Sequence, residues 1–304
     1  MAEDQGLLLI VNPAAGRGRT RKLLPAIREG LRQRGIVFQL LETKGKGHAT
    51  ELAAGAKGSV VVAVGGDGTV NEVVNGIAGT GKILGILPTG SANDLLKAIR
   101  IPADLSAALD VLVRGTAQPL DLPEVIVDGQ GDHTDVRRFF LNGMGVGFDA
   151  QVAAATAGIR YLSGLPLYAA AVLKTLGRYK APEFRITIDG DRASGPKLLV
   201  AVGNGPCAGG GFFLTPDAKP DDGLLDVCVI DERSILGIFR LMPAVMSGKH
   251  LHLDSVLYRK CRSLVLQSET PFAVHADGEM VATGARRVEV GLRERALKVL
   301  VDYG

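Results

Sequence analysis

The 304-residue sequence lacks several features that would define a class of protein. Its three cysteines, Cys207, Cys228 and Cys261, form no CxxC pair, so we expect neither a disulfide framework nor a zinc knuckle. No apolar run reaches the ~18 residues of a membrane span, and the acidic start MAEDQG is not typical of a secretory signal. The net charge of +3 is too small to indicate nucleic acid as a partner. We therefore expect a cytoplasmic protein that at most touches a membrane.

Familiar catalytic and nucleotide-binding motifs are also missing. The segment Gly76–Ile83 nearly matches a P-loop, but it ends in Ile and lies between a helix and a strand, the reverse of the required order. No GxGxxG follows the first strand, and the sequence contains neither GxSxG nor HExxH. The sequence therefore does not support a P-loop enzyme, a dinucleotide-binding Rossmann site, an α/β-hydrolase or a zinc protease.

Glycine, in contrast, is abundant, with 40 residues in the chain, whereas about 7% is usual. Apolar residues make up 46% and charged residues 22%, so the chain can bury a large core and is not disordered. A chain of this length usually divides into two domains. The excess of glycine therefore calls for a local reason, such as turns or close approach of the backbone to a ligand.

The first 120 residues alternate between strand and helix patterns. The expected strands are Leu7–Val11, Phe38–Thr43, Val60–Val64 and Ile83–Leu87. The expected helices are a basic one ending at Gly35, His48–Lys57, one from about Thr69, Asn93–Ile99 and Leu105–Val113. This βαβα order predicts an α/β domain with a mostly parallel sheet, assigned to residues 1–128.

Strand patterns dominate after Leu120, which predicts a β-rich domain, a sandwich, over residues 129–304. The extreme C-terminus could pack back on the first domain. Helical patterns interrupt at Tyr161–Tyr179 and Ile235–Met246. The expected strands are Val125–Val127, Phe139–Asn142, Phe184–Asp189, Leu198–Gly203, Leu225–Ile230, Val256–Leu257, Leu264–Gln267, Phe272–His275, Val288–Leu292 and Leu297–Val301. A cleft between two domains is the usual place for a ligand.

The segment Gly65-Gly66-Asp67-Gly68 follows a buried strand and precedes a helix. Glycines let backbone N–H groups approach phosphate oxygens, and the helix start adds partial positive charge. Asp67 would repel phosphate unless a divalent cation lay between them, so the pattern indicates a Mg²⁺–nucleotide site. A tight turn with a Thr69/Glu72 capping box is the structural alternative, and both can hold at once.

Two more strand ends carry polar loops, Asn12-Pro13-Ala14-Ala15-Gly16 and Thr89-Gly90-Ser91. In parallel sheets ligands gather at the carboxyl ends of strands, so the three loops should form one anion-binding rim. A helix cap by Ser91, with Asp94 three residues on, is the simpler interpretation of the last loop.

These loops and two later blocks resemble the soluble bacterial diacylglycerol/lipid kinase family, relatives of sphingosine and ceramide kinases. Gly65–Glu72 is similar to the signature loop, which NAD kinases and phosphofructokinases share. Gly203–Val227 and Val274–Glu279 are similar to blocks of the second domain and favour a lipid kinase. The resemblance implies an N-terminal NAD-kinase-like α/β domain, a C-terminal β-sandwich and an active site in the interdomain cleft. It also implies transfer of the ATP γ-phosphate, with Mg²⁺, to the hydroxyl group of a lipid. Diacylglycerol is the first candidate for that lipid.

The resemblance also implies roles for individual residues. The ATP contacts would be Asn12, Pro13, Ala14, Ala15, Gly16, Thr43, Gly66, Asp67, Gly68, Thr69, Val70, Asn71, Glu72 and Ser91. Asp67, Asp94 and Asp121 would surround Mg²⁺, and a structural Mg²⁺ would lie near Lys219, Asp222 and Leu224. Asp277 and Glu279 are the candidate bases, with a slight preference for Glu279. An Asp277-Gly278 hairpin turn is the structural alternative.

The lipid acceptor implies a transient contact with the inner face of an anionic membrane. The sequence does not decide whether the chain forms a homodimer. The apolar stretch Ile159–Leu173, flanked by Arg160 and Lys174, is either a membrane-contacting lid or a core helix. The seven basic residues between Arg17 and Arg34 are either a solvated helix face or a phosphate or membrane contact. A kinase with a soluble acceptor such as NAD, and a nucleotide- or lipid-binding regulator without turnover, are the alternative functions.

Overall fold

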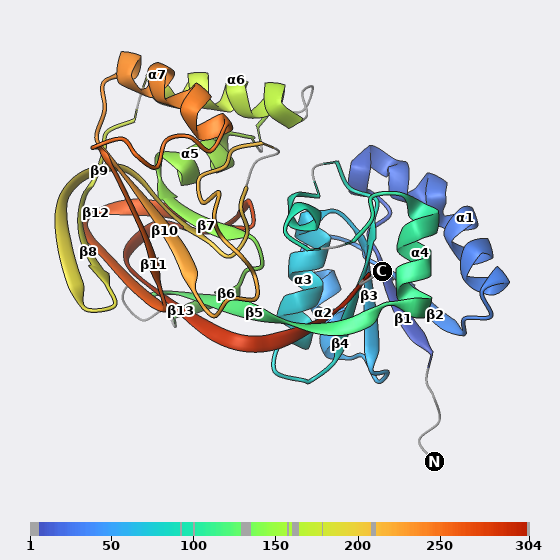
Figure 1. Ribbon diagram of the computed structural model, residues 1–304. Helices are drawn as coiled ribbons and strands as arrows, with labels where there is room; N and C mark the ends of the chain where they lie inside the picture. Colours follow the sequence, from blue (N-terminus) through green and yellow to red (C-terminus); the bar gives the residue numbers. More distant parts are fainter. Residues whose placement is uncertain are drawn as a thin grey trace. The chain divides into compact units, whose positions relative to one another are not determined.

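The computed structural model describes residues 6–91, 93–99, 101–128, 135–156, 158–159, 164–177, 179–207 and 211–302. The chain forms two compact units (Figure 1), each treated separately below. Unit 1 consists of Met1–Asp121 and Glu294–Gly304, and unit 2 of Leu122–Arg293. Strands β5 (Thr116–Val127) and β13 (Glu279–Val301) each belong to both units.

Unit 1 is a parallel sheet between helices, in the order β13–β4–β3–β1–β2. The end of β13 joins it where Lys298 and Val299 pair with Ile83 and Leu84. Its other strands are β1 (Leu7–Val11), β2 (Phe38–Glu42), β3 (Val60–Gly65) and β4 (Ile83–Pro88). Its helices are η1 (Ala15–Gly18), α1 (Arg19–Gln33), α2 (His48–Ala54), α3 (Asp67–Ile77), η2 (Asp94–Lys97) and α4 (Leu105–Arg114).

Alternation along the buried strands of unit 1 decides which helices cover which face. Leu9, Val11, Val62 and Val64 share a core with α1 and α4. The intervening side chains face the side of α2 and α3, because neighbouring strand residues point to opposite faces. The buried strands of unit 1 consist of nearly continuous apolar residues because helices cover both faces of the sheet. Arg21, Lys22, Arg28 and Arg32 lie on the exposed side of α1, as a solvated helix face requires.

Unit 2 is antiparallel and β-rich, with β11–β10–β9–β7–β12–β13 adjacent in that order. β8 pairs with both β12 and β9, while β5 pairs with β13 and β6. The further strands are β6 (Val136–Phe139), β7 (Gly143–Gly147), β8 (Glu183–Ile188), β9 (Asp191–Gly203), β10 (Leu225–Asp231), β11 (Val256–Cys261) and β12 (Ser263–Ala276). Three helices, α5 (Phe148–Thr156), α6 (Gly164–Leu176) and α7 (Ile235–Met246), complete it.

Two cores divide the side chains of β9 and β10. Val200, Val202, Val227 and Val229 pack inside the strand layers with Phe140, Phe184 and Phe272, among others. Leu199, Ala201, Cys228 and Ile230 point the other way and pack against α5, α6 and α7. The sheet of unit 2 therefore has a second apolar face, and the three helices cover it.

Several expected boundaries were wrong. β12 joins the expected strands Leu264–Gln267 and Phe272–His275, and β13 joins the two expected near the C-terminus. A register shift between Gln267 and Phe272 explains the first case, because the polar residues between them interrupt the pattern but not the pairing. The expected helix Asn93–Ile99 is only the short 3₁₀ turn η2, after Asn93 in the left-handed region. Tyr161, where another helix was expected to begin, lies outside the described residues.

Candidate functional site

The polar loops after β1, β3 and β4 lie at the carboxyl ends of three parallel strands and contact one another. Asn12 Nδ2 donates to Thr69 Oγ1 at 3.1 Å, which joins the first loop to the start of α3. The hydroxyl oxygens of Thr20 and Thr89 lie 2.6 Å apart, which joins the start of α1 to the loop after β4. The polar strand ends thus form one connected rim in unit 1.

The second and third loops approach so closely that only glycine fits between them. A Cβ on Gly90 would lie 2.3 Å from Gly66 Cα, and one on Gly66 would lie 3.1 Å from Gly90 Cα. The amides of Thr89 and Gly90 both donate to Gly65 O, at 2.9 and 3.0 Å. Gly66 is the N-cap of α3 and no side chain caps this helix, so its start can offer backbone N–H groups to an anion.

The start of α3 differs from the expectation. The helix begins at Asp67 rather than at Thr69, and the capping box indicated by the Thr69–Glu72 spacing is not formed. Glu72 instead accepts from Gly47 N at 2.8 Å and from Ala49 N at 3.1 Å, at the start of α2. The Thr69 hydroxyl accepts a hydrogen bond from Asn12. Thr69 and Glu72 therefore link α3 to neighbouring elements instead of capping it.

The other expected nucleotide contacts have varied surroundings. The amide of Ala14 donates to Asn12 Oδ1 at 3.1 Å, which shapes the loop that also contains Pro13 and Ala15. Thr43 N donates to Val11 O at 2.8 Å, directly after β2. Ser91 is exposed and caps no helix, whereas Val70 and Asn71 are buried in α3. Gly16, Arg17 and Gly18 all have positive φ, of 57°, 56° and 84°, which turns the chain sharply into α1.

Backbone amides donate to two of the three carboxylates expected around Mg²⁺, those of Asp67 and Asp121. Asp67 Oδ1 accepts from Leu95 N at 3.3 Å, next to the buried Asp94. Asp121 is fully buried, and its Oδ1 accepts from Arg295 N at 2.8 Å. In the part of the chain that the structure describes, no three His, Cys, Asp or Glu side chains converge as a metal site. Protein Mg²⁺ sites often use one or two carboxylates plus waters and substrate phosphates, so Asp67 beside the glycine loops fits such an ion.

Gly90→Ala should weaken nucleotide binding by about tenfold or more, because the added Cβ displaces the Gly66 loop from the rim. Isothermal titration with ATP and Mg²⁺ would measure this loss. Gly45→Ala is the matched control, since a Cβ there meets nothing within 4 Å. Equal affinity in the two variants would contradict a phosphate site at Gly66 and Gly90.

In unit 2, Asp277 and Gly278 form the two-residue turn between β12 and β13. Both have positive φ, 48° and 79°, as a type I′ hairpin turn requires. The Asp277 carboxylate accepts from Leu141 N at 2.8 Å, Asn142 N at 2.9 Å and Gly143 N at 3.0 Å. Asp277 N donates back to Gly143 O at 2.8 Å. The hairpin alternative therefore holds, and the turn is fastened to the start of β7.

His275 and Asp149 form a buried pair behind this turn, with Nε2 and Oδ2 2.8 Å apart and both side chains 5% exposed. A Cβ on Gly145 would lie 2.1 Å from Asp149 Oδ2 and 2.6 Å from His275 Nε2, so the pair requires glycine there. Burial lowers the pKa of His275, but the carboxylates of Asp149 and Asp277 outweigh burial and raise the pKa overall. Sequence reasoning missed this pair, and the one signal near it was the unexplained Asn142-Gly143-Met144-Gly145 motif.

The raised pKa of His275 predicts how stability depends on pH. The protonated pair stabilises the fold fully below the unfolded histidine pKa of ~6.5, and this contribution disappears as the pH rises through the folded pKa. Between these values the free energy of unfolding should fall by up to about 1.4 kcal/mol per pH unit. Urea unfolding from mildly acidic to alkaline pH would measure the slope, with His275→Gln as control. If the free energy of unfolding of His275→Gln changed with pH as steeply as that of the unmodified chain, His275 would not be the source of the pH dependence.

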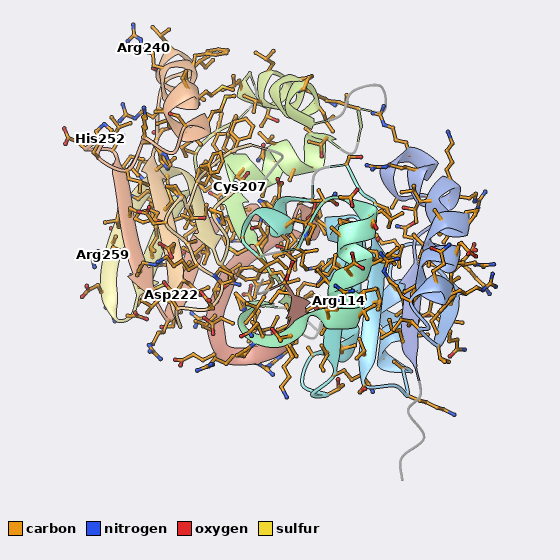
Figure 2. The ribbon with its side chains drawn as sticks, turned by 45° about the vertical axis from the view of Figure 1, so that its right-hand side comes forward. Arg114, Cys207, Asp222, Arg240, His252 and Arg259 are labelled. Atoms are coloured by element: carbon orange, nitrogen blue, oxygen red, sulfur yellow. The ribbon has the colours of Figure 1, made fainter. Side chains whose placement is uncertain are left out.

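Lys260 pairs with Asp222 and Asp226 in the segment around Lys219–Leu224, which was expected to hold a structural Mg²⁺. Asp222 is labelled in Figure 2. Asp222 accepts from Leu224 N at 3.1 Å and from Lys260 Nζ at 2.9 Å. Lys260 Nζ also lies 3.0 Å from the buried Asp226. The Lys260 ammonium group therefore contacts both carboxylates. A metal ion at Lys219, Asp222 and Leu224 stays a prediction.

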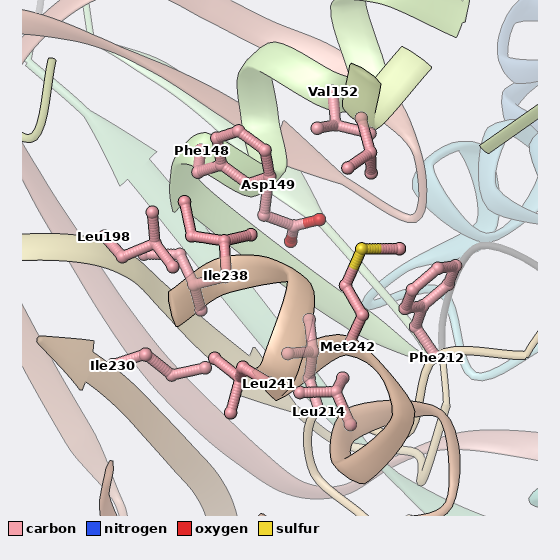
Figure 3. A pocket seen from close by; sticks show the side chains of 13 residues that line it. Phe148, Asp149, Val152, Leu198, Phe212, Leu214, Ile230, Ile238, Leu241 and Met242 are labelled. Atoms are coloured by element: carbon pink, nitrogen blue, oxygen red, sulfur yellow. The ribbon is translucent and has the colours of Figure 1, made fainter. Parts of the chain in front are cut away.

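An apolar cavity of about 60 Å³ lies beneath α7 in unit 2 (Figure 3). Its wall combines Phe148 and Val152 of α5, Val172 of α6 and Ile238, Leu241 and Met242 of α7, among other apolar residues. Among the described residues of the lining, Asp149 is the one charged residue, and Figure 3 shows its carboxylate among apolar side chains. This lining suits a hydrocarbon group whose polar end lies near Asp149.

Comparison with known proteins adds independent findings. Residues 6–125 match the family described as "Diacylglycerol kinase catalytic domain", and residues 143–301 match "YegS C-terminal NAD kinase beta sandwich-like domain". A diacylglycerol kinase of Staphylococcus aureus (strain MRSA252) is 31% identical over 277 residues, covering 89% of this chain and 85% of the relative.

Solved structures agree with this pattern. A putative diacylglycerol kinase from Bacillus anthracis str. Sterne has a TM-score of 0.77 at 25% identity and covers 99% of both chains. Yeast NADH kinase, solved in complex with NADH, has a TM-score of 0.59 at 12% identity, covering 99% of this chain and 84% of that one. This second likeness shows the fold alone. The α/β unit and the β-sandwich unit are therefore NAD-kinase-like in fold, as expected from the sequence.

Proposed function

The chain belongs to the bacterial diacylglycerol kinase family and is a lipid kinase, and we propose that it transfers the γ-phosphate of ATP, with Mg²⁺, to the hydroxyl of diacylglycerol. The product would be phosphatidic acid. The observation that carries this proposal is the close approach of the Gly66 and Gly90 backbones at the start of α3, where no side chain caps the helix. Phosphoryl transfer needs positioning and charge neutralisation more than covalent help from the protein.

The rim of unit 1 would hold the nucleotide. Backbone N–H groups at Gly66 and Gly68 and the positive end of α3 would face the phosphates. The hydrogen bond between Asn12 and Thr69 keeps the first loop against α3. Asp67 would hold the cation, and its carboxylate accepts from the amide of Leu95, the residue after the buried Asp94. Mg²⁺, when bound, neutralises charge on the β- and γ-phosphates.

In unit 2, Glu279 is the better candidate for the proton acceptor. Asp277 already accepts from three backbone amides, which suits an anchor for the turn. Glu279 directly follows the turn, where it pairs in register with Ala276. In the reaction the acceptor oxygen bonds to the γ-phosphorus, the bond from that phosphorus to the bridging oxygen breaks, ADP leaves, and the hydroxyl proton passes to the carboxylate.

The cavity beneath α7 supports an acceptor with a hydrocarbon chain. Its lining is apolar apart from one carboxylate, whereas a soluble dinucleotide acceptor would need a polar wall. We therefore favour diacylglycerol over NAD as the acceptor. The same chemistry implies that the chain meets its substrate at a bilayer surface.

A kinase assay against a panel of lipid alcohols and NAD, with product detection by mass spectrometry, tests this function. Phosphatidic acid from diacylglycerol, dependent on ATP and Mg²⁺, is the expected product. Phosphorylation of NAD alone would overturn the lipid proposal. ATP and lipid binding without any phosphorylated product would instead favour a regulator without turnover.

A further inference from the structure

The outward face of α7 is unusually apolar for a surface helix. Ile235, Leu236 and Phe239 are 52%, 58% and 43% exposed. They share this face with the exposed Arg240 and Pro243, because residues four apart lie on the same side of a helix. Of the seven large hydrophobic side chains exposed in the described part of the chain, three belong to α7 and one, Leu173, to α6.

The inward face of the same helix is apolar as well. Ile238, Leu241, Met242 and Val245 line the cavity described above, and Figure 3 labels the first three among the side chains of its lining. A helix that is apolar on both faces is normally buried on both. Among the residues of unit 2 that the structure describes, the side chains packed on α7 cover its inward face, whereas Ile235, Leu236 and Phe239 stay exposed. The outward face therefore calls for another apolar surrounding.

The charges around this face favour an anionic surrounding. Arg240 lies within the face and projects outward in Figure 2, while Arg233 and Lys249 lie just before and after the helix. Lys174 adds a further exposed positive charge beside Leu173 on α6, which lies on the same side of unit 2 as α7 in both views. Glu232 and Asp254 are the exposed acidic neighbours in sequence, so positive charge predominates.

We propose that the outward face of α7, together with Leu173 of α6, is the surface by which this kinase docks onto an anionic bilayer. Ile235, Leu236 and Phe239 would enter the headgroup region, and the basic side chains would contact the lipid phosphates. A second copy of the chain fits less well, because stable protein interfaces need about 20–30 residues a side. Within the described residues no helix has the length and apolar character to cross a bilayer, so the contact would be peripheral.

This inference rests on the proposed lipid acceptor, since it explains how a chain with an apolar cavity behind α7 would reach a membrane substrate. It assigns the contact mainly to α7 rather than to the stretch Ile159–Leu173, for which a membrane-contacting lid was one of two interpretations and a core helix the other. Ala171, Val172 and Leu176 of α6 are buried in the core, and Leu173 is exposed. Arg160 lies outside the described residues.

Co-sedimentation of the full chain with vesicles tests the surface. We would compare phosphatidylcholine vesicles with an equal mixture of phosphatidylcholine and phosphatidylglycerol. The double variant Leu236→Ser/Phe239→Ser should lower the partition coefficient on mixed vesicles by roughly tenfold or more, because two apolar side chains no longer insert. Arg240→Gln should lower it about fivefold on mixed vesicles and leave neutral vesicles unaffected.

Unit 1 offers matched controls at the end of α4. Val113 is 41% exposed there, and Arg114 beside it is exposed too. Val113→Ser and Arg114→Gln should bind vesicles like the unmodified chain. Equal losses in these controls, or no loss in the α7 variants, would overturn the proposal. Sedimentation that shows a dimer without vesicles, abolished by the α7 double variant, would assign the face to self-association instead.

Activity on a short-chain diacylglycerol dissolved as monomers separates this proposal from the function itself. The α7 double variant should keep that activity, because Leu236 and Phe239 do not line the cavity. If the unmodified chain lacks the activity, the proposed function fails, while vesicle binding still decides the docking surface. If the double variant loses this activity together with vesicle binding, the face has a structural role rather than a docking role.

Discussion

Asp67→Asn should lower kcat about 10²- to 10³-fold while the chain stays folded. Asparagine keeps an oxygen that can accept the hydrogen bond from Leu95 N, so the loop geometry survives. The negative charge that would hold Mg²⁺ at the phosphates is lost. Steady-state kinetics with dispersed diacylglycerol, run beside a thermal melt, would separate the chemical effect from an effect on folding.

The control for this variant removes a carboxylate elsewhere in unit 1. Asp110→Asn breaks an ion pair between α4 and Arg34, in which Arg34 Nε and Asp110 Oδ1 lie 2.8 Å apart. Exposed pairs contribute about 0–1 kcal/mol, so this variant should keep its turnover. Full activity of Asp67→Asn would contradict a cation role for Asp67, and a collapsed melting temperature would reassign Asp67 to folding.

Asp149→Ala should destabilise the chain by about 3–5 kcal/mol, the largest effect on stability that we expect. The change leaves His275 buried without the carboxylate that lies 2.8 Å from its Nε2. It also deprives the start of α5 of an acidic side chain. Urea unfolding followed by circular dichroism at pH 6 (about the unperturbed histidine pKa) would measure the loss.

Gly145→Ala tests the same pair without removing either partner. Its Cβ would press on both polar atoms, which should cost on the order of 1–3 kcal/mol. Gly291→Ala in β13 is the matched control, because nothing lies within 4 Å of its Cβ; it should shift stability by at most about 0.5 kcal/mol. If Gly145→Ala is as stable as this control, the pair tolerates displacement and does not require glycine.

The N-terminal sheet was predictable because local pattern and tertiary environment agree there. Strands such as Val60–Gly65 are covered on both faces, so their continuous apolar runs indicate buried parallel strands directly. Boundaries that depend on a distant partner were predicted less well. Glu72 has the spacing of a cap for its own helix, yet it binds the amides of Gly47 and Ala49 at the start of α2.

The candidate site shows the same division. Three polar strand ends in a βαβ chain must lie at one edge of a parallel sheet, so the rim around Gly66 and Gly90 followed from sequence order. The Asn142–Gly145 motif could not be explained in that way. Its meaning depends on Asp277, which is 134 residues away from Gly143 and binds its amide, and on the His275–Asp149 pair that leaves no room for a Cβ.

The sequence by itself determined the parallel and β-rich parts of the chain, the glycine loops and the family to which they belong, because these features are written in local periodicity and short motifs. Only the tertiary structure decided that Gly66 and Gly90 touch, that Asp277 anchors the turn before Glu279, and that α7 has an apolar outward face. Such facts arise when segments far apart in the chain pack together. Burial, close contact and exposure are properties of that packing, and local sequence does not encode them.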